Sequence, residues 1–342
     1  MTGFGVGFVG AGVATQAIHV PTLRSFGGAF RFVGCMDADG STARRVASQL
    51  GCAWTTDVSL LLGDPDVEIV VVGSPDAYHA DQIVAACEAG KRGILAEKPL
   101  VLTDLDVARV RRAVMESDAK LIVGTMHAYD SIVLSALNRW ETTDVQARYV
   151  DVRCYLPDNE EMISLATQVI APDAKAMQAL RLTEMEIARG GITSLASHDI
   201  PMLRRLVPDP LALDAAGSIH PWGYYLHGQA GDAVVRIVGM MGGHWQPDWS
   251  LCAVANDAVL RINFPPSFVS AGAARATIAT RDQAWSWTGD RSGYHGEWEE
   301  MLRVLRDGRE PRFSLDDVLG DTRYALDLVA QVPLVWQGAR HV

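Results

Sequence analysis

The sequence predicts an α/β fold in which a dinucleotide-binding Rossmann domain precedes an α+β domain. Three observations predict it: a glycine turn directly after the first apolar strand, strands alternating with helices through the first third of the chain, and successive strands without helices between them later on. We place the Rossmann domain, a doubly wound parallel sheet, at residues 1–123. Residues 124–342 are expected to form an α+β substrate-binding and oligomerisation domain with a large open, mostly antiparallel sheet.

The glycine turn follows the apolar strand Val6–Val9 directly. Gly10 allows the tight turn, and Gly12 lets the backbone approach a pyrophosphate at the amide end of the following helix. Thr15 stands where the third glycine of the fingerprint is expected, and a small residue there is tolerable for helix packing. The residues expected to contact the cofactor in this turn are Gly10, Gly12, Val13 and Ala14.

An acid closes the next apolar strand. Asp37 lies 25 residues after Gly12, near the offset at which a carboxylate meets the adenosine ribose hydroxyls. Its charge would repel a 2′-phosphate, and Ala38 and Asp39 follow it in place of an arginine. The sequence therefore favours NAD over NADP as cofactor.

Strands and helices alternate up to residue 124. The Val67–Gly73 run is almost unbroken and β-branched, which is typical of a strand buried on both faces of a parallel sheet. Thr103, with Asp106 three residues on, predicts a helix start. The other expected strands are Phe30–Met36, Arg92–Ala96 and Leu121–Gly124. The other expected helices are Val13–Phe26, Ser41–Leu50 and Asp76–Ala89.

The pattern changes after residue 124. We expect a long strand at Val145–Tyr155 and several strands between Leu211 and Arg281, separated by Gly, Pro, Asp and Asn. The expected helices are Asn159–Arg189, broken near Pro172, then Thr193–Leu206, and finally Glu297–Arg306 and Leu315–Val329.

The composition narrows the class of protein. The chain has 342 residues, enough for about two domains, and 49% of them are hydrophobic. A net charge of −11 argues against nucleic acid or an anionic membrane as partner. Five scattered cysteines without a CxxC pair indicate reduced thiols in a cytoplasmic protein. No apolar run approaches the roughly 18 residues that would cross a membrane.

Two polar motifs follow predicted parallel strands. Ser74-Pro75-Asp76 and Glu97-Lys98-Pro99 both lie at carboxyl ends of strands, where open α/β sheets bind ligands. Taken alone, Lys98 is more typical of a solvated surface lysine. However, the chain has only four lysines, and a lysine beside an oxidised nicotinamide can exchange a proton as arginine cannot.

The chain resembles the glucose–fructose oxidoreductase / inositol dehydrogenase (Gfo/Idh/MocA) family. The opening Val-Gly-Phe-Val-Gly-Ala-Gly with His19-Val20-Pro21, Pro75-Asp76-Ala77-Tyr78-His79 and Glu97-Lys98-Pro99 carry the likeness. A closing segment that begins at Glu297-Trp298 extends it over nearly the whole chain.

The resemblance implies an NAD(P)-dependent oxidoreductase of sugars or cyclitols, with an oligomer interface on the second sheet. Lys98 would touch substrate and cofactor as the proton-transfer group, and Glu97 would lie on the nicotinamide side. Ser74, Pro75 and His79 are further expected cofactor-binding residues. A homodimer or homotetramer is expected.

One family signature is altered. The family has an aspartate four residues before a histidine on a helix, and here Ser194 precedes His198 at that spacing. The spacing puts both on one helix face, where Ser194 can orient the imidazole or bind a substrate hydroxyl but cannot supply a negative charge. Asp199 lies about 100° round the helix from His198, which makes it a poor substitute. A lone histidine of this kind is more often structural. The alignment favours His198 as a catalytic or substrate-orienting residue.

Weaker candidates lie just after the sixth strand. If that strand continues, His127 and Tyr129 share a face that could look into the cleft, with substrate contact and packing equally open. The remaining histidines form no spacing typical of a metal site, so no metal is predicted. Trp285 and Trp287 alternate along one strand face, which fits a subunit interface.

The leading interpretation is a dehydrogenase or ketoreductase acting on a ring hydroxyl or ketone of a polyol, with Lys98 transferring the proton and His198 assisting. Ser194 keeps two alternatives open: redox-neutral glycoside cleavage or imine or enone reduction with the same cofactor, and a non-catalytic NAD-binding protein.

Overall fold

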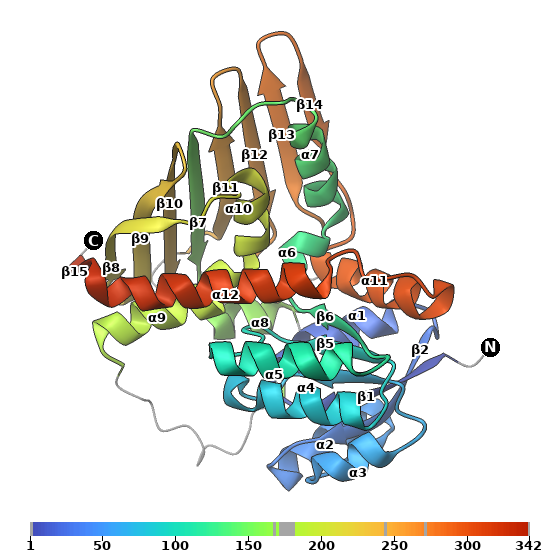
Figure 1. The fold of residues 1–342 in the computed structure, drawn as a ribbon. Coiled ribbons are helices and arrows are strands. Elements are labelled where there is room, and N and C mark those ends of the chain that lie inside the picture. Colours follow the sequence, from blue (N-terminus) through green and yellow to red (C-terminus); the bar gives the residue numbers. More distant parts are fainter. Residues whose placement is uncertain (1–2, 167–168, 171–181, 243–244, 270–271, 341–342) are drawn as a thin grey trace. The chain divides into compact units, whose positions relative to one another are not determined.

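The structure is a computed structural model that describes residues 3–166, 169–170, 182–242, 245–269 and 272–340. By its internal contacts the chain divides into two compact units (Figure 1). The first comprises Met1–Gly124, Ala166–Ala179 and Glu297–Thr322, and the second comprises Thr125–Leu165, Leu180–Gly296 and Arg323–Val342. The roles expected for residues 1–123 and 124–342 stay predictions.

Six strands in the described part of the first unit form a parallel sheet in the order β3-β2-β1-β4-β5-β6. They are β1 (Phe4–Val9), β2 (Phe30–Met36), β3 (Ala53–Thr55), β4 (Ile69–Val72), β5 (Gly93–Ala96) and β6 (Lys120–Val123). This is the strand order of a doubly wound dinucleotide-binding fold, which reverses between β1 and β4. The predicted Rossmann fold is confirmed.

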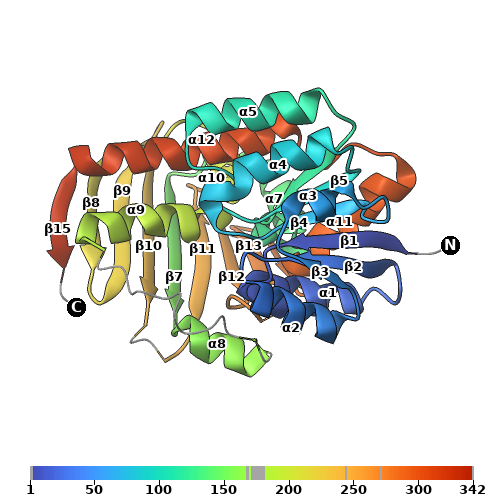
Figure 2. The ribbon, with the colours of Figure 1, turned by 90° about the horizontal axis from the view of Figure 1, so that it is seen from below.

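Helices lie on both sides of this sheet (Figure 2). The central strand β4 is completely buried because its four side chains are all apolar and β-branched. The helices of the unit are α1 (Val20–Arg24), α2 (Gly40–Leu50), α3 (Val58–Gly63), α4 (His79–Glu88) and α5 (Asp104–Met115), with a 3₁₀ turn η2 (Asp76–Tyr78) before α4. Thr103 caps α5 by accepting from the Asp106 amide at 3.1 Å, as predicted.

The helix expected after the glycine turn contains a π-turn, η1 (Thr15–His19), directly before α1. Pro21 has no N–H to donate to the carbonyl four residues back. The Val20 amide bonds instead to the carbonyl of Thr15, five residues back. The chain thus stays helical through Pro21, at the cost of one wider turn.

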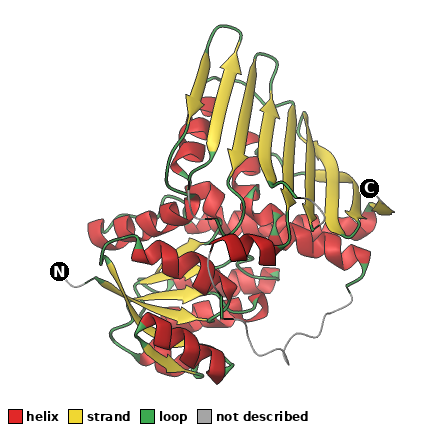
Figure 3. Cartoon of the chain, turned by 180° about the vertical axis from the view of Figure 1, so that it is seen from behind, coloured by secondary structure: helices red, strands yellow, loops and turns green. Residues whose placement is uncertain are grey.

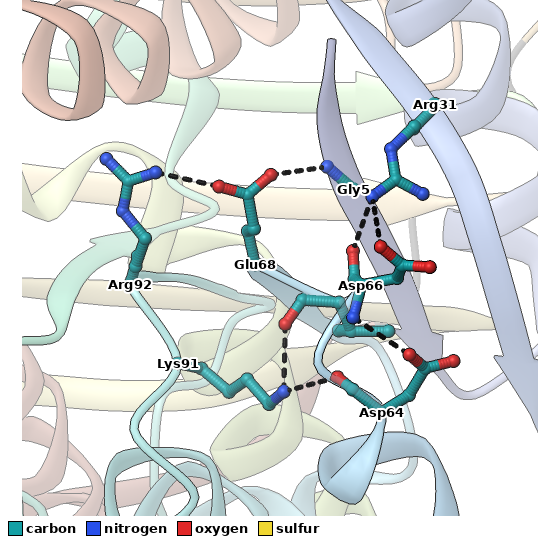
Figure 4. Close-up of polar contacts among 8 residues, drawn as sticks. Gly5, Arg31, Asp64, Asp66, Glu68, Lys91 and Arg92 are labelled. Atoms are coloured by element: carbon teal, nitrogen blue, oxygen red, sulfur yellow. Dashed lines mark hydrogen bonds and ion pairs between the residues drawn. The ribbon is translucent and has the colours of Figure 1, made fainter. Parts of the chain in front are cut away.

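Polar contacts close the amino end of the parallel sheet (Figure 4). The buried Lys91 ammonium donates to the carbonyl oxygens of Asp64 and Val67, both at 2.8 Å. Glu68 forms an ion pair with Arg92 at 2.7 Å. These bonds join the loops that precede β4 and β5.

The second unit is built on a mixed sheet. In the described residues nine strands follow the order β14-β13-β12-β11-β7-β10-β9-β8-β15, and all pairs are antiparallel except β7 with β10 and β8 with β15. The strands are β7 (Tyr149–Leu156), β8 (Ala212–Ile219), β9 (Trp222–Ala230), β10 (Ala233–Met241), β11 (Asp248–Val254), β12 (Ala258–Phe264), β13 (Arg275–Thr280), β14 (Ala284–Trp287) and β15 (Trp336–Arg340). The large, mostly antiparallel sheet is confirmed.

Helices α7 and α9 pack on one face of this sheet, α7 on β12–β14 and α9 on β8 and β9. Figure 3 shows the sheet from its other face. The helices are α6 (Met126–Tyr129), α7 (Ser131–Glu141), α8 (Asn159–Ala166), α9 (Glu184–Ser194) and α10 (Ile200–Leu206), with 3₁₀ turns η3 (Ala196–His198) and η4 (Val332–Leu334). Two longer helices, α11 (Gly293–Asp307) and α12 (Leu315–Gln331), contribute residues to both units.

Two local expectations are wrong. The helix expected over 193–206 is broken: α9 ends at Ser194, a 3₁₀ turn follows, and α10 starts with Pro201 in its first turn. The strand before His127 does not continue, because β6 ends at Val123 and Met126–Tyr129 forms one helical turn. The predicted helix break near Pro172 lies outside the described residues.

No helix within the described ranges is both long and apolar enough to cross a membrane.

Candidate functional site

The glycine turn after β1 is shaped by backbone conformation. Gly10 has a φ of +101°, and a Cβ there would lie 2.5 Å from the carbonyl oxygen of Gly73 at the end of β4. Only glycine fits at this reversal point of the sheet. Gly12 is exposed, and a Cβ built on it meets nothing within 4 Å. The turn therefore leaves open space in front of its backbone, as a pyrophosphate site requires.

Side chains hold this turn in place. Thr15, at the position of the third glycine, donates its hydroxyl to the Gly10 carbonyl at 2.6 Å. Gln16 donates to the Ala11 carbonyl at 2.7 Å and accepts from the Ile170 amide at 2.8 Å. Neither role was predicted from the sequence, where Thr15 figured only as a tolerable small residue.

Asp37 joins β2 to the glycine turn. Its carboxylate accepts from the Ala11 amide at 2.8 Å and from the Asp39 amide at 2.9 Å. Each carboxylate oxygen has a second acceptor site, so ribose hydroxyls can still bind. Val13 and Ala14 are half-buried at the start of the helix. They lie close in sequence to Ala11, whose amide donates to the Asp37 carboxylate.

The loops after β4 and β5 are tied together by His79. Its Nε2 lies 2.9 Å from the Ser74 carbonyl oxygen and its Nδ1 lies 2.8 Å from that of Pro99. The ring is 1% exposed, while Ser74 is half-buried and Pro75 exposed. His79 thus positions both loops, and its direct contact with a cofactor stays a prediction.

Glu97 and Lys98 follow β5, and both are half-buried. The Glu97 carboxylate lies 3.0 Å from His19 Nε2 and accepts from the Lys98 amide at 3.3 Å. Burial acts to raise the pKa of Glu97, but the His19 hydrogen bond and the Lys98 charge outweigh it and bring that pKa below its ordinary value. Glu97 is therefore a carboxylate at neutral pH, adjacent in sequence to the candidate proton donor.

A buried aromatic and polar cluster occupies the second unit. His127 stacks on Phe264 with ring centroids 3.9 Å apart, and its Nδ1 lies 3.3 Å from an oxygen of Asp199. Asp199 also accepts from the Trp249 indole N–H at 3.1 Å. Burial raises the pKa of Asp199, against the lowering effect of these bonds. His198 lies in the same cluster, its ring centroid 5.8 Å from that of His127.

The contact with Asp199 indicates which ring nitrogen of His127 carries the proton. A carboxylate accepts, so Nδ1 carries a proton and donates it. Nε2 is buried without a hydrogen-bond partner in the part of the chain that the structure describes. The sequence identified His127 as a candidate but gave no sign that Asp199 pairs with it.

The remaining candidates are placed as follows. Ser194 ends α9 and is half-buried, while His198 ends the following 3₁₀ turn and is buried. The two do not share a continuous helix. The prediction that four-residue spacing places them on one helix face is therefore wrong. Tyr129 is 5% exposed in α6. Among the described residues, no group of three His, Cys, Asp or Glu side chains could hold a metal ion.

The strand order, the glycine turn at the β1–β4 reversal and the acid after β2 define the first unit as a dinucleotide-binding Rossmann fold. Residues 4–125 match the sequence profile described as the GFO_IDH_MocA oxidoreductase family, NAD-binding Rossmann fold. This part of the chain is therefore similar to the NAD-binding domain of the Gfo/Idh/MocA family.

Named relatives support this assignment. The chain is similar to inositol 2-dehydrogenase 1 of Saccharopolyspora erythraea, 38% identical over 128 residues that cover 36% of this chain and 37% of that protein. It is 34% identical to inositol 2-dehydrogenase of Rhizobium meliloti over 222 residues, which cover 62% of this chain and 58% of the relative. The aligned regions thus span less than two thirds of either relative.

Solved structures share the fold over the whole chain. KijD10, a 3-ketoreductase from Actinomadura kijaniata crystallised with NADP and TDP-benzene, superposes with a TM-score of 0.73. The match covers 99% of both chains at 16% sequence identity. At this identity the likeness shows a common fold.

Proposed function

We propose that this protein is an NAD(P)-dependent oxidoreductase, with NAD preferred, that acts on a ring hydroxyl or ketone of a sugar, cyclitol or related polyol. The observation that carries the proposal is the set of groups at the carboxyl edge of the parallel sheet. The turn after β1, Asp37 after β2, and Glu97-Lys98 after β5 all lie at this edge. The names of the inositol dehydrogenases to which the chain is similar support the substrate class.

The residues at this edge fit a dinucleotide. The open space over Gly12 and the amides at the start of the following helix suit the pyrophosphate, and Asp37 suits the ribose hydroxyls. Asp37 and Asp39 would both repel a 2′-phosphate, which favours NAD. When bound, the nicotinamide supplies hydride transfer at a substrate carbon.

Lys98 handles the proton in this proposal. Its Nζ takes the proton of the substrate hydroxyl during oxidation and returns one to the ketone oxygen during reduction. Glu97 holds a negative charge beside it. His198 and Ser194 orient the substrate hydroxyl, and His127 and Tyr129 are further substrate contacts.

The proposal is tested by titrating the purified protein with NAD and NADP, followed by a panel of cyclitols, sugars and their ketones. We expect NAD to bind more tightly than NADP and NADH to accumulate with at least one cyclitol or sugar. Lys98→Met should lower kcat by about 10²- to 10⁴-fold and change cofactor affinity little. Lys98→Arg should not restore the rate, because a guanidinium does not release its proton.

Three results would count against it. Binding without turnover across the panel would indicate a non-catalytic NAD-binding protein. Turnover without net NADH would favour redox-neutral cleavage. Full turnover by folded Lys98→Met would remove Lys98 from the proton-transfer step.

A further inference from the structure

His19 is a buried histidine with partners on both ring nitrogens. It ends the π-turn η1, within the His19-Val20-Pro21 motif, and its side chain is 0% exposed. Its Nε2 faces Glu97, and its Nδ1 faces the indole nitrogen of Trp298 on α11. All three residues belong to the first unit, and the proposed mechanism uses neither His19 nor Trp298.

The partners indicate the tautomer of His19. An indole nitrogen can only donate, so the Trp298 N–H donates to Nδ1 at 3.3 Å and Nδ1 acts as acceptor. The single proton of the neutral ring is therefore on Nε2. From there it is donated to Glu97 Oε1 at 3.0 Å. Trp298 thus selects the form of His19 that can hold the carboxylate.

The second oxygen of Glu97 is also held. Oε2 accepts from the Lys98 amide at 3.3 Å, and a Cβ on Gly124, after β6, would lie 3.3 Å from the carboxyl group. With its side chain 14% exposed, Glu97 has little room to turn, yet it remains open to a neighbouring group. The negative charge beside Lys98 is therefore fixed in direction.

The indole of Trp298 is kept in place by packing that does not depend on its N–H. Its ring meets Phe30 edge to face with centroids 5.0 Å apart, and the side chain is fully buried. A change that removes only the N–H can therefore separate the hydrogen bond from the packing.

We infer that His19 is a positioning residue for Lys98: Trp298 fixes its tautomer, and His19 in turn fixes the Glu97 carboxylate beside the Lys98 ammonium. The inference rests on the proposed function, in which Lys98 transfers the proton. Among the described residues, the charge of Lys98 acts on Glu97, and the charge of Glu97 acts on Glu297, which is buried next to Trp298 in the chain. By this inference, the His19-Val20-Pro21 motif supports proton transfer by Lys98.

The first test uses ¹⁵N-labelled histidine and needs no cofactor. Long-range ¹H–¹⁵N spectra of the whole chain should show the neutral His19 ring with its proton on Nε2 and none on Nδ1. The His19→Gln spectrum assigns the signal. In Trp298→Phe the Nδ1 atom loses its donor, and the His19 ring should show a mixture of the two neutral tautomers. A wild-type ring protonated on Nδ1 would overturn the inference.

The second test compares His19→Leu with His19→Gln by the pH profile of kcat/KM. Leu removes both hydrogen bonds, so kcat/KM should fall by about 10- to 100-fold. The limb due to Lys98 should also move to lower pH, because the ammonium form loses its fixed counter-charge. Gln keeps an amide donor and an acceptor, and should retain most of the activity and the wild-type profile.

The outcomes separate the two proposals. A folded and active His19→Leu protein with the wild-type pH profile would overturn the role of His19 alone. A wild-type protein that shows the expected tautomer but binds neither NAD nor NADP would instead overturn the proposed function.

Discussion

Asp199 is a buried acid of the second unit, and its partners are two aromatic side chains. Ser194, four residues before His198 in the sequence, carries no charge. The Asp199 carboxylate lies against His127 and Trp249. In this chain, His127 is therefore a histidine held against an acidic side chain, with a proton on Nδ1.

Glu297 is a second buried acid, and it gives a prediction about pH and stability. It is 1% exposed, and its Oε1 has no hydrogen-bond partner within the described ranges. Burial, and then the charge of Glu97, raise the pKa of Glu297 well above its ordinary value of 4.5. The folded protein thus keeps a proton that the unfolded chain loses above about pH 4.5.

The direction in which stability changes with pH follows from this difference in bound protons. Where the folded state binds more protons, the free energy of unfolding falls as pH rises, by up to about 1.4 kcal/mol per pH unit for one group. Glu297→Gln lacks this contribution. We expect its stability relative to wild type to increase between about pH 5 and pH 8, measured by urea unfolding at each pH.

The control is Glu299→Gln, an exposed glutamate two residues along the same helix. This variant tests whether the loss of an exposed glutamate from this helix changes the slope. A Glu297→Gln protein whose stability changes with pH in parallel with wild type would contradict a protonated Glu297 in the fold.

At the scale of elements, the amino end of the parallel sheet depends on Lys91. The ammonium bridges two backbone carbonyls at 2.8 Å and is buried, which lowers the pKa of Lys91 from its ordinary value. Lys91→Met should reduce the free energy of unfolding by about 1 to 3 kcal/mol, because two buried carbonyls lose a charged donor. NAD affinity should stay within about twofold, since the glycine turn is at the other end of the strands.

Urea unfolding and calorimetric titration with NAD test this prediction. Lys120→Met is the matched control, because Lys120 pairs with the exposed Glu310 and such exposed pairs contribute little. Equal stability of the Lys91 and Lys120 variants would show that the bridge is not stabilising.

The sequence predicts elements where a pattern has one physical solution. The apolar β-branched run ending at Gly73 fits only a strand buried on both faces, and Thr103 with Asp106 fits only a helix start. The π-turn before Pro21 was not predictable, because a proline also permits a kink or a helix start. Pro201 was a start signal for α10 that the expectation of one helix over 193–206 overlooked.

The residues of the candidate site were predictable where they lie at the ends of strands, but their long-range contacts were not. The residues at strand ends, from Gly10 to Lys98, follow from the order of strands and turns. The contacts of His19 with Trp298 and of His127 with Asp199 join positions 279 and 72 residues apart. Such pairings are set by tertiary packing, which local sequence patterns do not record.

At the scale of the whole molecule, we expect a subunit interface on the face of the nine-stranded sheet that lies opposite α7 and α9. On this face Val238 is half-buried, and it pairs across the strands with Tyr225 and Arg153. Arg236, two residues before it, bonds Asp151 at 2.6 Å. A two-fold interface here would bury Val238 from both copies.

We expect the purified protein to be a homodimer or homotetramer. Val238→Glu should weaken its assembly at least about 100-fold, because it buries a like charge from each copy. Light scattering after gel filtration, over a range of concentrations, measures the mass. Leu60→Glu, on an exposed position of α3 in the first unit, is the control and should leave the mass unchanged. A monomeric wild type would remove this interface.

Glu297–Thr322 belongs to the first unit although most of the second unit precedes it in the sequence. This order affects folding while the chain is being synthesised. Trp298 covers Phe30, and Met301 lies where a side chain on Gly93 would be, so the Rossmann sheet emerging from the ribosome lacks part of its covering. Synthesis proceeds at about 5 to 20 residues per second, so on the order of ten seconds or more pass between synthesis of that sheet and synthesis of α11. During this interval the apolar surface that α11 covers in the folded protein stays exposed, and shortening the protein from its carboxyl end would leave it exposed.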